Sequence, residues 1–97
     1  MTIKERILEI KEMLKTEAVE IATRKVACKN KQRSGTYAGR EQSTLLDMRY
    51  EWRHKFIAYC QLKGRTLDEI EPKCRVGNEP DQNLVDKFKE EFTRDVE

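Results

Sequence analysis

The sequence predicts an all-α protein with a long antiparallel helical hairpin, a short connecting helix and a C-terminal helix that closes the core. Apolar residues recur at spacings of three and four along most of the chain, which is the period of an amphipathic helix. Four times, near the start of such a segment, a potential N-cap residue precedes a carboxylate by three positions. The 97 residues contain only two prolines and four glycines, fewer than a turn-rich β fold needs. The length indicates a single domain, residues 1–97.

The first predicted helix covers residues 3–29 and begins after a potential cap at Thr2. Its apolar row alternates spacings of four and three, as in helices that pack lengthwise on a partner helix. The row consists of Ile3, Ile7, Ile10, Leu14, Ile21 and Cys28. Glu17 and Arg24 interrupt it. Each of these charges either meets an opposite charge on a neighbouring element or turns outward, and the spacing alone leaves both options open.

The second predicted helix covers residues 44–63, starts at a potential cap on Thr44 and has the largest apolar surface. Its main stripe, which fits the first helix in a hairpin, contains Leu45, Met48, Trp52, Phe56, Tyr59 and Cys60. We therefore assign Trp52 and Phe56 to the core. A second stripe contains Leu46, Tyr50 and Ile57. It fits either the C-terminal segment or a second copy of the chain, so a homodimer remains open. The wetter side is expected to hold Asp47, His54, Ala58 and Gln61.

The C-terminal third is expected to contain two shorter helices. Gly64 can adopt the left-handed conformation that ends a helix. A short helix is predicted over residues 66–71, with Thr66 as its cap, followed by a turn-rich connection over residues 72–82. The last helix is predicted over residues 83–94, capped by Asn83, and its apolar face should cover the N-terminal part of the first helix.

Charge is distributed very unevenly along the chain. Residues 24–65 contain eleven Lys or Arg and three Asp or Glu, whereas residues 66–97 contain five and ten. Such a separation is typical of a nucleic-acid surface joined to an acidic segment, or of two faces that meet different partners. The alternative is that the acidic segment folds back and neutralises the basic middle, or simply keeps its helix soluble.

The segment of residues 30–43 is predicted to be a long basic loop between the two helices. Residues 24–40 contain six Lys or Arg and no Asp or Glu, together with small residues and an aromatic ring at Tyr37. Cations attract phosphates, small residues let backbone donors approach, and an aromatic ring can stack on an unpaired base. The spacing is not that of a P-loop. A solvated loop and a protein contact are the alternatives. The candidate nucleic-acid-binding residues are Lys25, Lys29, Lys31, Arg33, Tyr37, Arg40, Arg49 and Arg53.

No catalytic residue, metal site or cofactor is expected. His54 is the only histidine; we expect it at the surface, and no nucleophile is forced near it. The three cysteines, Cys28, Cys60 and Cys74, lack close pairing, so we expect small buried side chains rather than disulfides or a zinc site.

The most plausible function is a small non-enzymatic accessory protein of nucleic-acid metabolism. Its basic hairpin tip would contact DNA or RNA while other surfaces dock on a larger protein. The alternative is a phage- or mobile-element-type modulator that binds a host nucleic-acid enzyme purely through protein contacts. No membrane-spanning or signal segment is evident, so we expect a cytoplasmic protein with no membrane partner.

Overall fold

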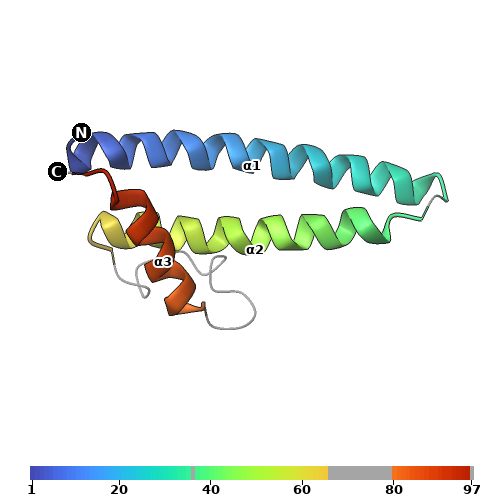
Figure 1. Cartoon of the computed structure of the whole chain (residues 1–97). Helices are drawn as coiled ribbons and strands as arrows, with labels where there is room; N and C mark the ends of the chain where they lie inside the picture. The colour runs from blue at the N-terminus through green and yellow to red at the C-terminus, as the bar shows by residue number, and fades with distance from the viewer. Residues whose placement is uncertain (36, 66–79, 97) are drawn as a thin grey trace.

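The protein is an all-α hairpin closed at one end by a third helix (Figure 1). The structure, a computed structural model, describes residues 1–35, 37–65 and 80–96. It contains α1 (Ile3–Arg33), α2 (Gly39–Leu62) and α3 (Gln82–Thr93), and no strand occurs in the described residues. α1 and α2 run antiparallel, and α3 packs at the end opposite the hairpin tip. The predicted fold class is confirmed. The short helix expected at residues 66–71 lies outside the described residues.

The start of α1 follows the predicted capping pattern. Thr2 Oγ1 accepts a hydrogen bond from the Glu5 backbone N–H at 3.3 Å and donates one to the Glu5 carboxylate at 3.2 Å. The Thr2 hydroxyl thus satisfies one backbone N–H of the first turn, as in half of a capping box, while the Glu5 carboxylate accepts from the hydroxyl rather than from the Thr2 backbone. At the other end, Gly35 has φ +80°, and its N–H donates to the Gln32 carbonyl. α1 therefore continues four residues beyond the predicted end, until a glycine supplies the left-handed conformation that closes it.

The prediction of a 14-residue loop at residues 30–43 is wrong. The connection comprises only residues 34–38, because α1 continues to Arg33 and α2 already begins at Gly39. Polar side chains on both sides of the tip point into solvent without disturbing helical hydrogen bonding, so low hydrophobicity was a poor indicator of a loop there. The predicted cap at Thr44 is also wrong, since Ala38 precedes α2 and forms no side-chain cap.

The core lies where α3 meets the hairpin. Its buried residues are Ile10, Leu14, Ile57, Ala58, Tyr59, Cys60, Val85, Phe88 and Phe92. α3 covers the N-terminal part of α1 as predicted: Arg6 Nε donates to the Phe92 carbonyl at 2.7 Å, and the guanidinium lies 6.0 Å from the Phe92 ring centre. This hydrogen bond satisfies one of the last carbonyls of α3, which have no partner within the helix.

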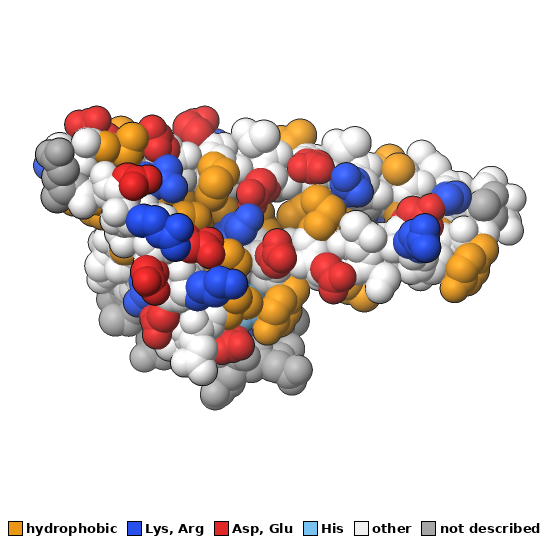
Figure 2. All heavy atoms as spheres, in the orientation of Figure 1, with side chains coloured by type: hydrophobic (Ala, Val, Ile, Leu, Met, Phe, Trp, Pro, Cys, Tyr) orange, Lys and Arg blue, Asp and Glu red, His pale blue; other side chains and the backbone are white. Residues whose placement is uncertain are grey.

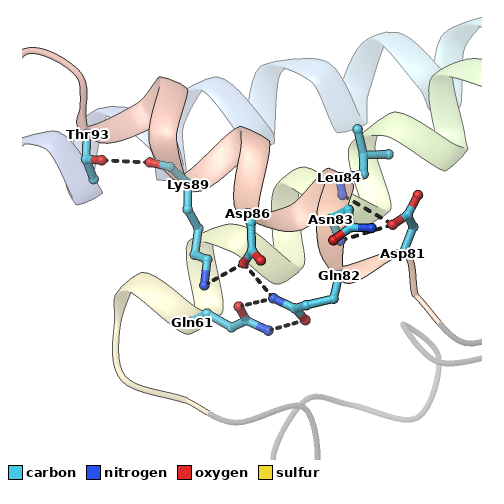
Figure 3. A network of polar contacts seen from close by, with 8 residues as sticks. All are labelled: Gln61, Asp81, Gln82, Asn83, Leu84, Asp86, Lys89 and Thr93. Carbon is cyan, nitrogen blue, oxygen red and sulfur yellow. Dashed lines mark hydrogen bonds and ion pairs between the residues drawn. The ribbon is translucent and has the colours of Figure 1, made fainter.

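The N-terminus of α3 is tied to α2 by polar contacts (Figure 3). Asp81, not the predicted Asn83, is the N-cap, and its carboxylate accepts from the backbone N–H groups of Asn83 and Leu84. Gln61 and Gln82 exchange two amide hydrogen bonds at 3.1 and 3.2 Å. Gln82 also donates to Asp86, whose carboxylate pairs with Lys89; these contacts lower the pKa of Asp86 below its usual value.

The prediction of a surface histidine is wrong. His54 is completely buried, and its Nε2 accepts the backbone N–H of Asp81 at 3.0 Å. Ala58, expected on the same wet side, is also completely buried. The start of α3 docks on this side of α2, so a face that looks polar in a helical projection is covered by another element. Of the second apolar stripe, Ile57 is buried, whereas Leu46 and Tyr50 are 62% and 50% exposed.

Glu17 and Arg24, the two charged residues in the apolar row of α1, have different surroundings. Glu17 meets Lys55 of α2 at 3.1 Å, and Lys55 Nζ lies 5.7 Å from the Phe88 ring centre. Arg24 turns outward and pairs with Glu20 of its own helix at 3.3 Å. Both options left open by the spacing are therefore realised, one at each position.

Candidate nucleic-acid interface

The predicted site residues gather at the tip because both helices carry them there. Lys25, Lys29 and Arg33 are four residues apart on α1, so they lie on successive turns of one ridge. Arg40 belongs to the first turn of α2, directly across the short connection. All four side chains are exposed. The tip is thus a rigid helical scaffold for cations rather than the flexible loop expected from the sequence.

Two cations near the tip are neutralised by acids of the chain. Lys31 forms a hydrogen-bonded ion pair with Glu41, which joins the last turn of α1 to the first turn of α2. The Lys31 ammonium holds the pKa of the Glu41 carboxyl below its usual value. Arg24 pairs with Glu20. Both cations therefore already have a carboxylate partner within the chain.

The other tip cations form no ion pair or hydrogen bond with any residue of the ranges 1–35, 37–65 and 80–96. These residues are Lys25, Lys29, Arg33 and Arg40. Arg49, farther along α2, is likewise exposed and unpaired within those ranges, whereas Arg53 is partly buried and engaged in contacts. Arg33 is in the last turn of α1, where a cation also stabilises the terminal carbonyl groups. Arg40 lies close enough to Glu41 to help lower the pKa of that carboxyl.

Among the described residues, Tyr37 is the most exposed large apolar side chain, at 86%. Its ring lies against Gly39, where the Cβ of a larger residue would clash with it. Tyr37 precedes Arg40 by three positions in the chain. A solvent-exposed aromatic ring is suited to stacking on an unpaired base.

The acidic C-terminal segment does not neutralise the tip in the part that the structure describes. α3 packs at the far end of the hairpin, and the molecule is 51 Å along its longest axis. Figure 2 shows acidic side chains mixed with basic ones over α3 and the adjoining ends of α1 and α2. Many of these pair locally, as Asp86 does with Lys89. The acids of α3 are thus separated in space from the tip cations.

A shallow cavity of about 240 Å³ between α1 and α2 was not predicted. Its lining residues are Lys11, Leu14, Lys15, Ala18, Trp52, Phe56 and Tyr59. Trp52 and Phe56 stack on each other with ring centres 5.3 Å apart and pack against the core, as predicted, but both are only partly buried. The signal that was missed is the spacing of Lys11 and Lys15, which places both lysines beside the apolar row of α1.

Outside the tip and the cavity, the described residues include few groups that could react or bind a metal ion. Cys28 and Cys60 are buried, as expected of small apolar side chains; Cys74 lies outside the described residues. Within the described ranges, no three His, Cys, Asp or Glu side chains are grouped to hold a metal ion. None of the described helices is both long enough and apolar enough to cross a bilayer.

Compared with known proteins, the chain matches no family model, no curated protein and no solved structure.

Proposed function

We propose that the protein is a small, non-enzymatic accessory of nucleic-acid metabolism that contacts DNA or RNA through its hairpin tip. The observation that carries this proposal is the group of exposed tip cations without an ion-pair partner among the described residues: Lys25, Lys29, Arg33 and Arg40. Like charges four residues apart on one helix repel each other by a few tenths of a kcal/mol. A phosphate backbone offsets that repulsion and releases its condensed counterions on binding.

The arrangement supports contact with the backbone more than reading of base sequence. The tip cations on α1 repeat at the four-residue interval of one helix ridge, which suits phosphate contacts that do not depend on sequence. Leu46 and Tyr50, both well exposed on α2, favour a protein contact on another surface. They also support the second candidate, a modulator that binds a larger nucleic-acid enzyme purely through protein contacts.

The test is a titration of labelled DNA and RNA at several salt concentrations. A triple variant, Lys29→Gln, Arg33→Gln and Arg40→Gln, removes three tip cations. Its matched control, Arg65→Gln, Lys87→Gln and Arg94→Gln, removes three exposed cations elsewhere. We expect the tip variant to weaken binding and to reduce the slope of log affinity against log salt by about 2 to 3, because each phosphate contact contributes about 0.7 to 0.9.

The control variant should retain most of the affinity and the salt slope. Equal losses in the two variants would show that net charge alone drives binding and would contradict the assignment to the tip. If the unmodified protein bound neither DNA nor RNA at about 50 mM salt, where phosphate contacts are strong, the nucleic-acid proposal would fail and the protein-binding alternative would replace it.

A further inference from the structure

A row of basic and small residues, which we call the basic row, runs along α1 beside its apolar face. The row follows spacings of four and three residues, as a straight line on a helix surface does. Its members are Lys11, Lys15, Ala18, Ala22, Lys25 and Lys29, and Arg33 follows one turn later. At 1.5 Å per residue, the distance from Lys11 to Arg33 is about 33 Å. The row contains no acid, although Lys15 also approaches Glu12 at 3.4 Å in an exposed pair, which contributes little.

A second row on α2 borders the same side of the hairpin. It has the same spacing and consists of Leu45, Arg49, Trp52, Phe56, Tyr59 and Lys63. Its middle residues line the cavity together with Lys11, Lys15 and Ala18, the first three residues of the α1 row, so the two rows face each other across it. The second row also contains no acid. Lys63 Nζ lies 5.2 Å from the Tyr59 ring centre, which places a further cation beside the aromatic floor.

The cavity combines an apolar aromatic floor with a cationic border. The Trp52 indole is held in place because its Nε1–H donates to the Leu14 carbonyl at 2.9 Å, and Phe56 stacks on it. Between the flanking lysines and the tip cations, the row on α1 has only Ala18 and Ala22. These small side chains let a ligand approach the helix backbone, and Arg49 belongs to the row facing them.

We infer that this face of the hairpin binds single-stranded nucleic acid, with an unpaired base in the cavity and the adjoining phosphates along the basic row to the tip. The inference rests on the proposed function and extends it from the tip to the length of α1. Positive charge repeated over about 33 Å matches a polyanion better than it matches one charged side chain. An apolar floor with stacked aromatic rings takes the planar face of a base, which a duplex does not expose.

Trp52 is the only tryptophan of the chain, so the protein's own fluorescence reports binding at the cavity. We expect an oligothymidylate to quench Trp52 fluorescence, while a DNA duplex with the same number of phosphates binds without quenching. An abasic strand of the same length keeps the phosphates but lacks the bases. It should bind about 5- to 150-fold more weakly than the oligothymidylate, the range expected for loss of one base–aromatic stack, and should leave the fluorescence unchanged.

A double variant, Lys11→Gln with Lys15→Gln, tests the row away from the tip. It should weaken oligothymidylate binding and reduce the salt slope by about 1.4, at about 0.7 per lost phosphate contact, without affecting duplex binding. The charge-matched control is Lys87→Gln with Arg94→Gln. It should change neither the affinity for the oligothymidylate nor the salt slope. Lys11 and Lys15 are exposed, so circular dichroism should show an unchanged fold.

Three results would overturn the inference. One is oligothymidylate binding that depends on the tip but neither quenches Trp52 nor responds to the double variant; this leaves the proposed function intact. Another is that the abasic strand binds with the same affinity as the oligothymidylate. The third is stronger quenching by a polyglutamate peptide of equal charge, which would make the cavity a site for acidic peptides. If no nucleic acid binds at all, the proposed function itself fails.

Discussion

His54 shows how one side chain connects two helices. Its ring is completely buried, with Nδ1 2.8 Å from the Tyr50 carbonyl and Nε2 3.0 Å from the Asp81 backbone nitrogen. Since the Asp81 N–H must donate, Nε2 carries no proton, and Nδ1–H donates to the carbonyl. The neutral imidazole therefore accepts a hydrogen bond from the backbone of Asp81, the N-cap residue of α3. The Tyr50 ring adds a contact at 4.3 Å between ring centres.

Replacing His54 by Phe should destabilise the fold. Phe fills a similar volume but removes the acceptor of the Asp81 N–H, and loss of this partly buried hydrogen bond costs about 0.5 to 1.5 kcal/mol. The free energy of unfolding from urea titration measures this loss. Glu51→Ala, at an exposed position on the same helix, should change it by less than about 0.5 kcal/mol. Unchanged stability of the Phe variant would contradict the role assigned to the imidazole.

At the level of single residues, prediction succeeded where local chemistry decides the outcome. Thr2 caps α1 through Glu5, and Gly64 has φ +86° at the end of α2, both as expected. His54 failed because its environment comes from residues 27 positions away. Periodicity identifies an apolar face, but it does not reveal that a second element covers a polar one.

The hairpin helices are stabilised unevenly along their length. The apolar cluster that includes Ile10, Ile57 and Phe88 lies at the end covered by α3. Toward the tip, the buried apolar residues among those described are Cys28, Ala38 and Leu45. Fewer apolar contacts hold the helices together there, so this part should open more readily than the rest.

Hydrogen exchange can measure this difference. After correction for intrinsic rates, amides of residues 25–33 and 42–47 should exchange at least about tenfold faster than those of residues 54–60, because local opening costs less where few apolar groups are buried. Addition of a bound oligonucleotide should slow exchange at the tip more than at the α3 end. Uniform protection along both helices would contradict this gradient.

The start of α1 and the end of α2 were predictable, because Thr2 caps the first and Gly64, with positive φ, closes the second. The end of α1 was placed too early because Asn30 and its polar neighbours resemble a loop in composition, although nothing in them breaks a helix before Gly35. The same bias put the start of α2 five residues late. As a consequence, Lys31, Arg33 and Arg40, which were predicted to lie in a loop, belong to α1 and α2.

At the scale of the whole molecule, the main feature is the distance between the acids of α3 and the cations of the hairpin tip. The Cα radius of gyration is 15.5 Å, compared with about 12.5 Å for a compact chain of this length. Elongation keeps the acids of α3 away from the tip, so the small net charge of +2 conceals a strongly positive end. The sequence predicted the charge separation, but only the fold shows that it persists in space.

The position of a charge should therefore matter more than the total. Glu41→Gln releases Lys31 at the tip and should strengthen nucleic-acid binding, whereas Glu90→Gln, with the same change in net charge on exposed α3, should have little effect. Affinity at low salt, measured by fluorescence anisotropy, distinguishes them. Equal effects of the two variants would indicate that only net charge matters.

The same pair makes the effect dependent on pH. Lys31 lowers the pKa of Glu41, so the ion pair is intact above the usual carboxyl pKa and is lost as the pH falls through the lowered value. In acid, binding by the unmodified protein should approach that of Glu41→Gln.

Both chain termini lie at the end of the hairpin away from the tip (Figure 1). A purification tag, a fluorophore or a tether to a sensor chip attached at either terminus would leave the basic hairpin tip accessible. Immobilised measurements and fusion reporters are therefore compatible with the interface, whereas an insertion in the short connection between α1 and α2 would obstruct it.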